Sequence, residues 1–450
     1  MSARSLSSRK GAKGAKRPKR AKKRSRPLPP EYNLLLTATL CLLALGAVMV
    51  FSASSTTRVL QDGGLSDSAF YLKRTLLFGA VGLVIMHLTA RHGLKLVREA
   101  TPLLLGGSIF LLLAVLAVGT EVNGATRWLG GGFLQVQPSE LAKVALVLYA
   151  ADLLAQKPKR ARSLEGMMPI LLVVGVSSLL MMLQPDMGTT MVTTFAVGAT
   201  LVAAGARPAD LGKIGLGIAV LALLMAVVEP YRMARLTAFL NPGADAAGAG
   251  FQAAQAKIAL GSGGLFGVGI GNGVQKAFYL PEAHTDMISA VIGEELGLVG
   301  ITGVVGLFAL FGYAGLKTAQ KAKDVYGRIL VAGLTSLVLV QATINLFAVM
   351  GMAPLTGVPL PFVSYGNSSL MATLFAVGLI LNVARGGRAS AARGSTATGA
   401  GKLRLVQGGG ATARERSRSS GARRAKSGGG GGGNRGPRRA RNGGRRRASG

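Results

Sequence analysis

Long runs of apolar residues alternate along the chain with short breaks that carry charge or glycine. Each run is close to the roughly 20 residues that an α-helix needs to cross a hydrocarbon layer about 30 Å thick. The runs predict ten transmembrane helices, at residues 33–53, 72–90, 101–118, 139–154, 167–183, 188–204, 211–229, 287–315, 328–350 and 368–383. The predicted fold is therefore all-α and integral to the membrane, a polytopic bundle of about ten transmembrane helices.

Positive charge gathers at the two ends of the chain. The formal net charge is +34, and residues 1–32 and 384–450 carry +28 of it. Both segments are predicted to be disordered basic cytoplasmic tails, which leaves residues 33–383 as the membrane domain. Basic tails beside a membrane are attracted to its anionic inner leaflet, and this favours a membrane partner over nucleic acid.

The short charged breaks set the orientation of the predicted helices. Ten crossings place both termini on one side, and the positive-inside rule assigns basic short loops to the cytoplasm. The loops at residues 91–98, 157–162, 207–213 and 317–328 are rich in Lys and Arg. The long segment 230–286 then lies outside the cytoplasm, and a connection of this length usually carries binding or catalysis.

Some kinds of chemistry are disfavoured by the residues present. Cys41 is the only cysteine, so the chain forms neither an internal disulfide nor a cysteine-based metal site. The glycine-rich stretch 261–273 fits neither the P-loop nor the dinucleotide pattern and is predicted to be a flexible loop. Residues 251–260 have apolar positions at helical spacing, which predicts a short helix in the membrane interface or on the protein surface.

Two charged residues follow the proline that opens one predicted helix. Glu140 and Lys143 are three positions apart and therefore share a helix face, while Pro138 suits the first turn. Charges near the hydrocarbon layer cost several kcal/mol, so an ion pair there needs a reason. The pair is either structural, joining helices, or part of a functional site, and the pattern leaves both interpretations open.

Further polar residues lie in predicted outer segments. Asp186 follows Gln184 and Pro185 and is placed to cap the next helix, which is a structural role. Trp128 is suited to anchor the chain in the membrane interface, whereas Arg127 lies on the outer side against the positive-inside trend.

The strongest candidate site is the segment 281–286, which closes the long loop and ends in Asp286 at the start of an apolar helix. Small and polar residues share the side of that helix on which Asp286 lies: Ser289, Gly293, Glu294 and Gly297. Such a stripe predicts the lining of a cavity. The alternative is that Asp286 is only a helix cap and Glu294 an acid satisfied between helices.

Seven short strings follow one another along the chain, at residues 123–128, 137–143, 184–189, 231–242, 271–276, 280–297 and 359–365. In this order they resemble the SEDS family (shape, elongation, division and sporulation), membrane glycosyltransferases that polymerise peptidoglycan glycan strands. The strings 281–286 and 292–297 are more similar to the cell-division branch of the family than to its elongation branch.

The resemblance implies roles for individual residues. Asp286 matches the essential catalytic aspartate of the family, and Glu140 and Lys143 match the acid and base near it. The reaction implied is attack by a sugar hydroxyl of lipid II on the anomeric carbon of a glycan held by its polyprenyl diphosphate, with Asp286 as general base. Candidate substrate-binding residues, mostly cations for the diphosphate, are Arg127, Arg232, Arg235, Lys257, Lys276, His284 and Glu294. No residue is assigned as a metal ligand from the sequence. A divalent cation, Mg²⁺ or Mn²⁺, can share the task of stabilising the charge on the diphosphate.

The chain departs from the family pattern at a few positions. Asn367 stands where another glycine is usual, which affects the expected backbone conformation there, and Met287 and Ser289 replace residues that are commonly Phe. The implied partners are lipid II, a class B penicillin-binding protein transpeptidase, other division proteins and the membrane, with a position at the division septum. Two alternatives to a polymerase remain: a lipid II flippase or transporter, and a non-catalytic division scaffold.

Overall fold

The computed structural model describes most of the region between the two basic tails. The described residues are 28–61, 69–122, 125–132, 134–228, 233, 237, 239, 249–277 and 279–387. Most of both predicted tails, residues 1–27 and 388–450, therefore lies outside the described residues.

Ten α-helices lie within the described residues. They are α1 (Pro30–Gln61), α2 (Phe70–Val118), α3 (Pro138–Gln156), α4 (Leu164–Leu183), α5 (Met187–Ala203), α6 (Pro208–Val228), α8 (Ala249–Ser262), α9 (Ile288–Lys321), α10 (Val325–Val349) and α11 (Asn367–Ala384). Among these described helices, α1, α2, α4, α9, α10 and α11 are long and apolar enough to cross a membrane. The prediction of a polytopic bundle of about ten helices is confirmed.

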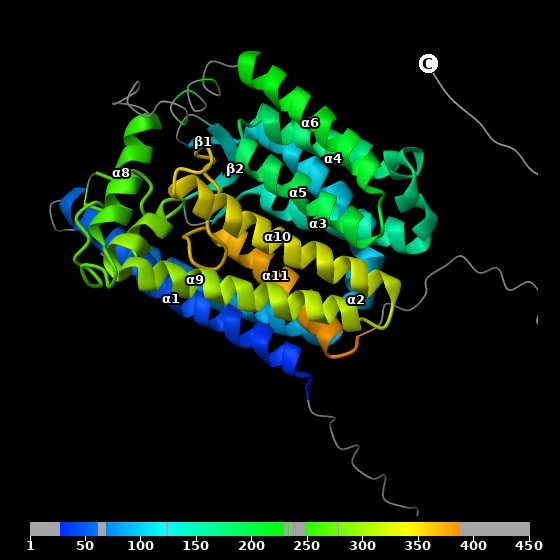
Figure 1. Cartoon of the computed structure of the whole chain (residues 1–450), viewed down its shortest axis with the longest axis horizontal. Helices are drawn as coiled ribbons and strands as arrows, with labels where there is room; N and C mark the ends of the chain where they lie inside the picture. Colours follow the sequence, from blue (N-terminus) through cyan, green and yellow to red (C-terminus); the bar gives the residue numbers. More distant parts are fainter. Residues whose placement is uncertain are drawn as a thin grey trace, which may run out of the picture. The chain divides into compact units, whose positions relative to one another are not determined.

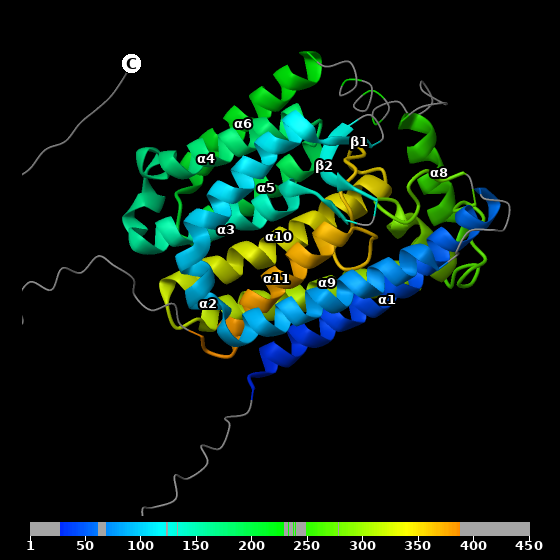
Figure 2. The ribbon, with the colours of Figure 1, turned by 180° about the vertical axis from the view of Figure 1, so that it is seen from behind.

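The predicted loop at residues 91–98 is wrong, because α2 runs through it as one helix of 49 residues. Gly93, Leu94 and Val97 of this segment are buried, while the side chains of Arg91 and Lys95 are exposed. Arg91 and Lys95 thus point away from the protein, while Gly93, Leu94 and Val97 pack against it, so the segment can remain helical. Figure 2 shows the first half of α2 beside α1 and the second half turning back past α3.

The core of the bundle is formed by the helices near the C-terminal end of the membrane domain. Figure 1 shows α10 between α5 and α9, and α11 packs against α2 and α10. Along an apolar stretch of 18 residues, 72% of the residues in α10 and 78% of those in α11 are buried, against 28% in α4. Polar side chains on α10 therefore face protein and not lipid, where they must find partners.

A small antiparallel sheet adds to the predicted all-α architecture. Strands β1 (Thr120–Val122), β2 (Ala125–Gly131) and β3 (Leu134–Val136) follow α2, in the order β1-β2-β3. Thr120 pairs with Trp128 and Leu129 with Val136. The segment was predicted only as an outer connection, and its strands pair because unpaired backbone groups next to a membrane are costly.

The long loop contains the predicted short helix, α8, and a tightly bound segment that follows it. The glycine-rich stretch 261–273, predicted to be a flexible loop, instead begins with the last two residues of α8 and continues as a segment hydrogen-bonded to α9. Gly297 interrupts α9 with φ 65° and ψ −159°, which frees backbone groups on both sides of it. Glu294 and Glu295 carbonyls accept hydrogen bonds from Val268 and Gly269, both at 3.0 Å. The break in α9 is therefore filled by the loop backbone.

Candidate active site

Glu140 and Lys143 form the ion pair that their spacing predicts. Their oxygen and nitrogen lie 2.6 Å apart in the first turns of α3, and each residue is only 2% exposed. Pro138 occupies the start of α3, as expected. The Lys143 ammonium also donates to Oε1 of Gln341 on α10 at 2.6 Å, so the pair joins α3 to the core helix α10.

Two amide side chains on α10 hold the connection that leads to α11. Gln341 donates from Nε2 to the carbonyl of Pro359 at 2.9 Å. Asn345, one turn further along α10, donates from Nδ2 to the carbonyl of Val358 at 2.8 Å and to the backbone carbonyl of Asp286 at 2.7 Å. One helix thus contacts both the Glu140–Lys143 pair and the candidate catalytic aspartate.

Asp286 lies two residues before the first residue of α9 and is half-buried. The N-cap position of α9 is occupied by Met287, so the interpretation of Asp286 as a simple helix cap is wrong. Oδ1 of Asp286 accepts from the Thr285 hydroxyl at 3.3 Å. Asp286 is one of the residues that line a small hollow, together with Asn345, Leu355, Thr356, Gly357 and Val358. Because it is only half-buried, Asp286 keeps some contact with its surroundings, as a general base must.

His284 lies beside Asp286 in sequence and is held by aromatic rings. Its ring centroid is 4.4 Å from that of Tyr71 on α2 and 5.5 Å from that of Tyr365, before α11. The backbone amide of Tyr365 donates to the His284 carbonyl at 2.9 Å. This predicted binding residue is thus brought to the same region as Asp286, with three segments of the chain meeting there.

Arg127 is brought to the turn between α4 and α5. Its guanidinium donates to the carbonyl of Gln184 at 3.2 Å and to that of Pro185. The predicted cap is confirmed, since Asp186 accepts from the backbone of Thr189 at 3.2 Å. The other oxygen of Asp186 accepts from the Ser139 hydroxyl at 2.9 Å, next to Glu140 in α3. In this arrangement Arg127 satisfies backbone carbonyls of a structural turn.

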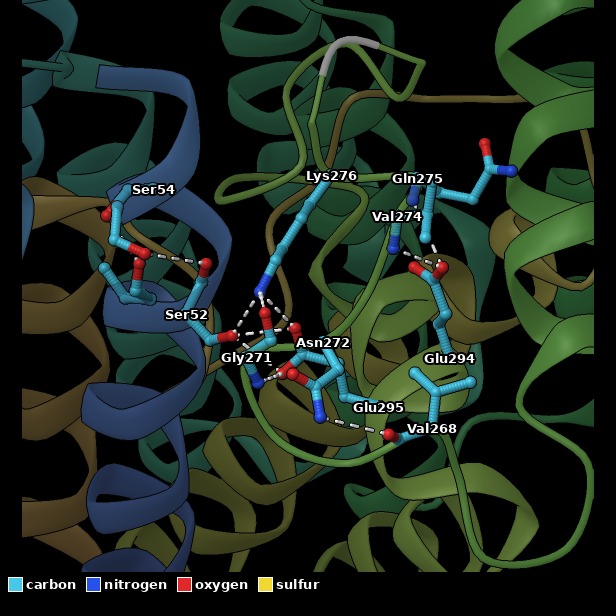
Figure 3. A network of polar contacts seen from close by, with 12 residues as sticks. Ser52, Ser54, Val268, Gly271, Asn272, Val274, Gln275, Lys276, Glu294 and Glu295 are labelled. Carbon is cyan, nitrogen blue, oxygen red and sulfur yellow. Dashed lines mark hydrogen bonds and ion pairs between the residues drawn. The ribbon is translucent and has the colours of Figure 1, made fainter. Parts of the chain in front are cut away.

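Lys276 and Glu294 belong to a separate polar network, drawn in Figure 3. Lys276 pairs with Glu295 at 2.6 Å, and the side chains are 1% and 0% exposed. Ser52 of α1 donates to the same carboxylate at 2.7 Å. Glu294 accepts from the backbone amides of Val274 and Gln275, at 2.8 and 3.1 Å. Both predicted binding residues therefore hold the loop that precedes Asp286 against α9 and α1.

A family model described as a cell cycle protein, covering FtsW, RodA and SpoVE, matches residues 32–389. The chain belongs to this family. It is the SEDS family of the resemblance, and the match spans the whole bundle from α1 to the end of α11.

Relatives and solved structures agree with this assignment to the SEDS family. The probable peptidoglycan glycosyltransferase FtsW of Trichlorobacter lovleyi is 40% identical over 79% of this chain and 94% of the relative. Stage V sporulation protein E of Bacillus subtilis is 42% identical over 78% and 96%. A chain of a peptidoglycan synthase complex aligns with TM-score 0.63 and 30% identity, over 78% and 96%. RodA of Thermus thermophilus aligns with TM-score 0.58 and 30% identity, over 78% and 95%.

The departures from the SEDS pattern are accommodated in the structure. Asn367 is the first residue of α11 and is 7% exposed, so it adopts helical backbone there. Met287 is 1% exposed at the start of α9, and Ser289 donates to Oδ1 of Asn345 at 2.8 Å. Met287 and Ser289 thus differ from the usual residues of the family, but Asp286 directly before them is present.

The predicted cavity-lining stripe of this SEDS chain is filled by protein. Ser289 faces α10, and a methyl group at Gly293 would overlap the Leu260 side chain of α8. Glu294 and Gly297 face the loop after α8. The small residues therefore serve close packing of backbone on α9, while Asp286 borders the hollow described above.

Of the remaining candidate binding residues, one lies within the described residues and two lie outside them. Lys257 on α8 is exposed, and its Nζ lies 2.9 Å from where a methyl group at Gly351 would be. Arg232 and Arg235 lie outside the described residues. Within the described ranges no group of three or more His, Cys, Asp or Glu is arranged to hold a metal ion. Because Mg²⁺ is usually held by one or two carboxylates together with substrate phosphates, binding of Mg²⁺ or Mn²⁺ stays a prediction.

Four residues of these networks were not singled out from the sequence. Gln341 and Asn345 are polar residues four apart in an otherwise apolar run, and Glu295 follows Glu294 in another. Polar groups in apolar helices are a usable signal for internal contacts. Ser52 carries no such signal, because a serine can satisfy its hydroxyl within its own helix.

Proposed function

We propose that this multi-pass membrane protein polymerises peptidoglycan glycan strands from lipid II during cell division. The observation that carries the proposal is the half-buried Asp286 at the edge of a small hollow, with its backbone carbonyl held by Asn345 of α10. The same helix binds the buried Glu140–Lys143 pair through Gln341. The name of the FtsW relative, a probable peptidoglycan glycosyltransferase, supports the same chemistry.

The proposed reaction transfers a glycan from its polyprenyl diphosphate to lipid II. Asp286 accepts the proton of the attacking sugar hydroxyl, whose oxygen forms the new bond to the anomeric carbon. The bond from that carbon to the diphosphate oxygen breaks, and the polyprenyl diphosphate leaves with the electron pair. General-base catalysis of this kind contributes about 10²–10⁴-fold.

The Glu140–Lys143 pair supports this step at a distance from solvent. Lys143 is only 2% exposed, so its ammonium interacts with Glu140 and Gln341 and does not face the solvent. The pair fixes Gln341, and Gln341 holds Pro359 next to the hollow wall. The negative charge on the leaving diphosphate is stabilised by exposed cations such as Lys257. Further candidates for this role are Arg232, Arg235 and a divalent cation.

The decisive experiment is polymerisation of labelled lipid II by the purified protein and by Asp286→Asn. The variant is expected to lose at least about 10²-fold in rate, because the amide cannot accept the proton. Asp210→Asn is the matched control, since it makes the same charge change near the start of α6 and should keep the wild-type rate. An Asp286→Asn protein that polymerises at the wild-type rate would refute the assignment.

The orientation proposed places both termini in the cytoplasm, the long loop outside and the protein at the division septum. Single cysteines in a Cys41→Ser background test the topology, with Lys257→Cys on α8 and Lys323→Cys between α9 and α10, both exposed. An impermeant thiol reagent applied outside intact cells is expected to label Lys257→Cys alone. Labelling of Lys323→Cys alone would show that the orientation is the reverse of the one proposed.

The partner proposed is a class B penicillin-binding protein transpeptidase, in company with other division proteins. The solved relative that belongs to a peptidoglycan synthase complex supports such an assembly. Adding the transpeptidase to the purified protein is expected to raise the polymerisation rate.

A scaffold would instead lose all function when residues 1–28 and 390–450 are removed, whereas an enzyme keeps its activity in vitro. A flippase would move lipid II across vesicles without forming glycan strands.

A further inference from the structure

Asn345 lies near the end of α10 and is 2% exposed. Its Nδ2 donates to the backbone carbonyl of Asp286 at 2.7 Å and to that of Val358 at 2.8 Å. Its Oδ1 accepts from the Ser289 hydroxyl at 2.8 Å. Both amide hydrogens and the amide oxygen are thus engaged, so the orientation of the side chain is fixed by its partners.

These three contacts join two walls of one hollow. Asp286 precedes α9 and Ser289 lies in its first turn, whereas Val358 belongs to the connection between α10 and α11; Asp286 and Val358 line the hollow. Gly357 lies next to Val358, and a methyl group placed there would be 3.8 Å from Oδ2 of Asp286. The amide of Asn345 therefore sets how far the Asp286 carboxylate lies from the opposite wall.

The neighbouring amide cannot take over this task. Gln341 is engaged with Pro359 through its nitrogen and with Lys143 through its oxygen. Loss of the Asn345 amide would leave the buried Val358 carbonyl and the half-buried Asp286 carbonyl without this donor, and the start of α9 would relax relative to the connection.

We infer that Asn345 is a positioning residue for glycan transfer, acting through its hold on Asp286 and Val358. The inference rests on the proposed function, because it gives Asp286 the role of base. Misplacement of a reacting group by about 1 Å can cost 10²-fold in rate. Asn345 itself does not touch the substrate in this role, so its removal changes kcat more than KM.

The test compares kcat and KM for lipid II polymerisation in four purified, full-length proteins. Asn345→Leu keeps the approximate size and removes all three hydrogen bonds, and a fall in kcat of about 10²-fold with KM within about 3-fold is expected. Ser289→Ala removes only the bond to Oδ1 of Asn345. Because both carbonyl contacts of Asn345 are retained, a smaller fall in kcat, about 3–10-fold, is expected.

Asn382→Leu is the matched control for loss of a buried amide. Asn382 on α11 is 6% exposed and donates to the carbonyls of Thr89 and Ala90 at 3.0 and 3.1 Å. It loses the same kind of contact outside the candidate site, so its kcat per folded protein should stay within about 3-fold of wild type. A structural effect alone would lower kcat equally in Asn382→Leu and Asn345→Leu.

The outcomes separate this inference from the proposed function. A wild-type kcat in Asn345→Leu, or a loss no larger than in Asn382→Leu, overturns the positioning role. If Asn345→Leu does not accumulate as folded protein, Ser289→Ala decides, and a wild-type kcat there overturns it. An active Asp286→Asn protein refutes the proposed function, whereas an inactive one beside a fully active Asn345→Leu refutes only the inference.

Discussion

Gln341 and Asn345 lie one turn apart on α10, and their amide nitrogens donate to the consecutive carbonyls of Pro359 and Val358. The two amides therefore fasten a connection without regular structure to the most central part of the bundle. Each also has a second duty, since Gln341 binds Lys143 and Asn345 binds the Asp286 carbonyl. The charged pair and the candidate base thus depend on one helix.

The Gln341 amide is predicted to serve both stability and rate. Gln341→Leu should lower the free energy of unfolding by about 1–3 kcal/mol, because the Pro359 carbonyl and Lys143 each lose a buried partner. Polymerisation should fall at least about 10-fold, since the hollow wall is no longer fixed. Thermal unfolding in detergent and a lipid II assay measure the two effects. Gln156→Leu, an exposed amide that donates to Asp152 on α3, is the control and should change neither.

The buried ion pair offers a way to separate structure from catalysis. Glu140→Gln and Lys143→Met each leave one buried charge without its partner, which should cost about 3–5 kcal/mol of folding free energy. The double variant removes both charges and should recover much of that loss. If the pair acts only as glue between helices, activity returns with stability. The proposed role predicts that activity remains low, and a fully active double variant would contradict it.

The second buried pair should control the order of the long loop. Lys276→Met leaves the Glu295 carboxylate, which is 0% exposed, without its cation. Hydrogen exchange in residues 263–277 is expected to rise as this segment detaches from α1 and α9. Lys321→Met removes a pair with Glu31 in which the lysine is 63% exposed, so it should cost no more than about 1 kcal/mol. Unchanged exchange in Lys276→Met would show that the network of Figure 3 does not hold the loop.

Gly297 is predicted to be intolerant of any side chain. Its φ of 65° disfavours other residues, and a methyl group there would overlap the Gly267 nitrogen and lie 2.6 Å from the Leu265 carbonyl. Gly297→Ala should therefore loosen the contact between the loop and α9 and lower the unfolding temperature. Gly303→Ala, later on the same helix, meets open space and should be neutral or slightly stabilising. Equal unfolding temperatures for the two variants would contradict this account.

The sequence alone determined the features that depend on neighbouring residues. Helices follow from the length of apolar runs, the Glu140–Lys143 pair from a spacing of three, and the Asp186 cap from its place after a proline. The predictions of the helices, the pair and the cap succeed because helix formation, capping and pairing within one turn are decided by residues close together in the chain. The family motifs also point to Asp286, whose catalytic role stays a prediction.

Only the tertiary structure decided which distant groups meet. Lys143 and Gln341 are 198 positions apart, and Lys276 and Ser52 are 224 apart. The burial of Lys276, the continuity of α2 and the loop bound in the break of α9 follow from packing, because a buried polar group takes whichever partner the fold brings near. Asn345 acquires its contact with Asp286 in the same way, through the packing of α9 on α10.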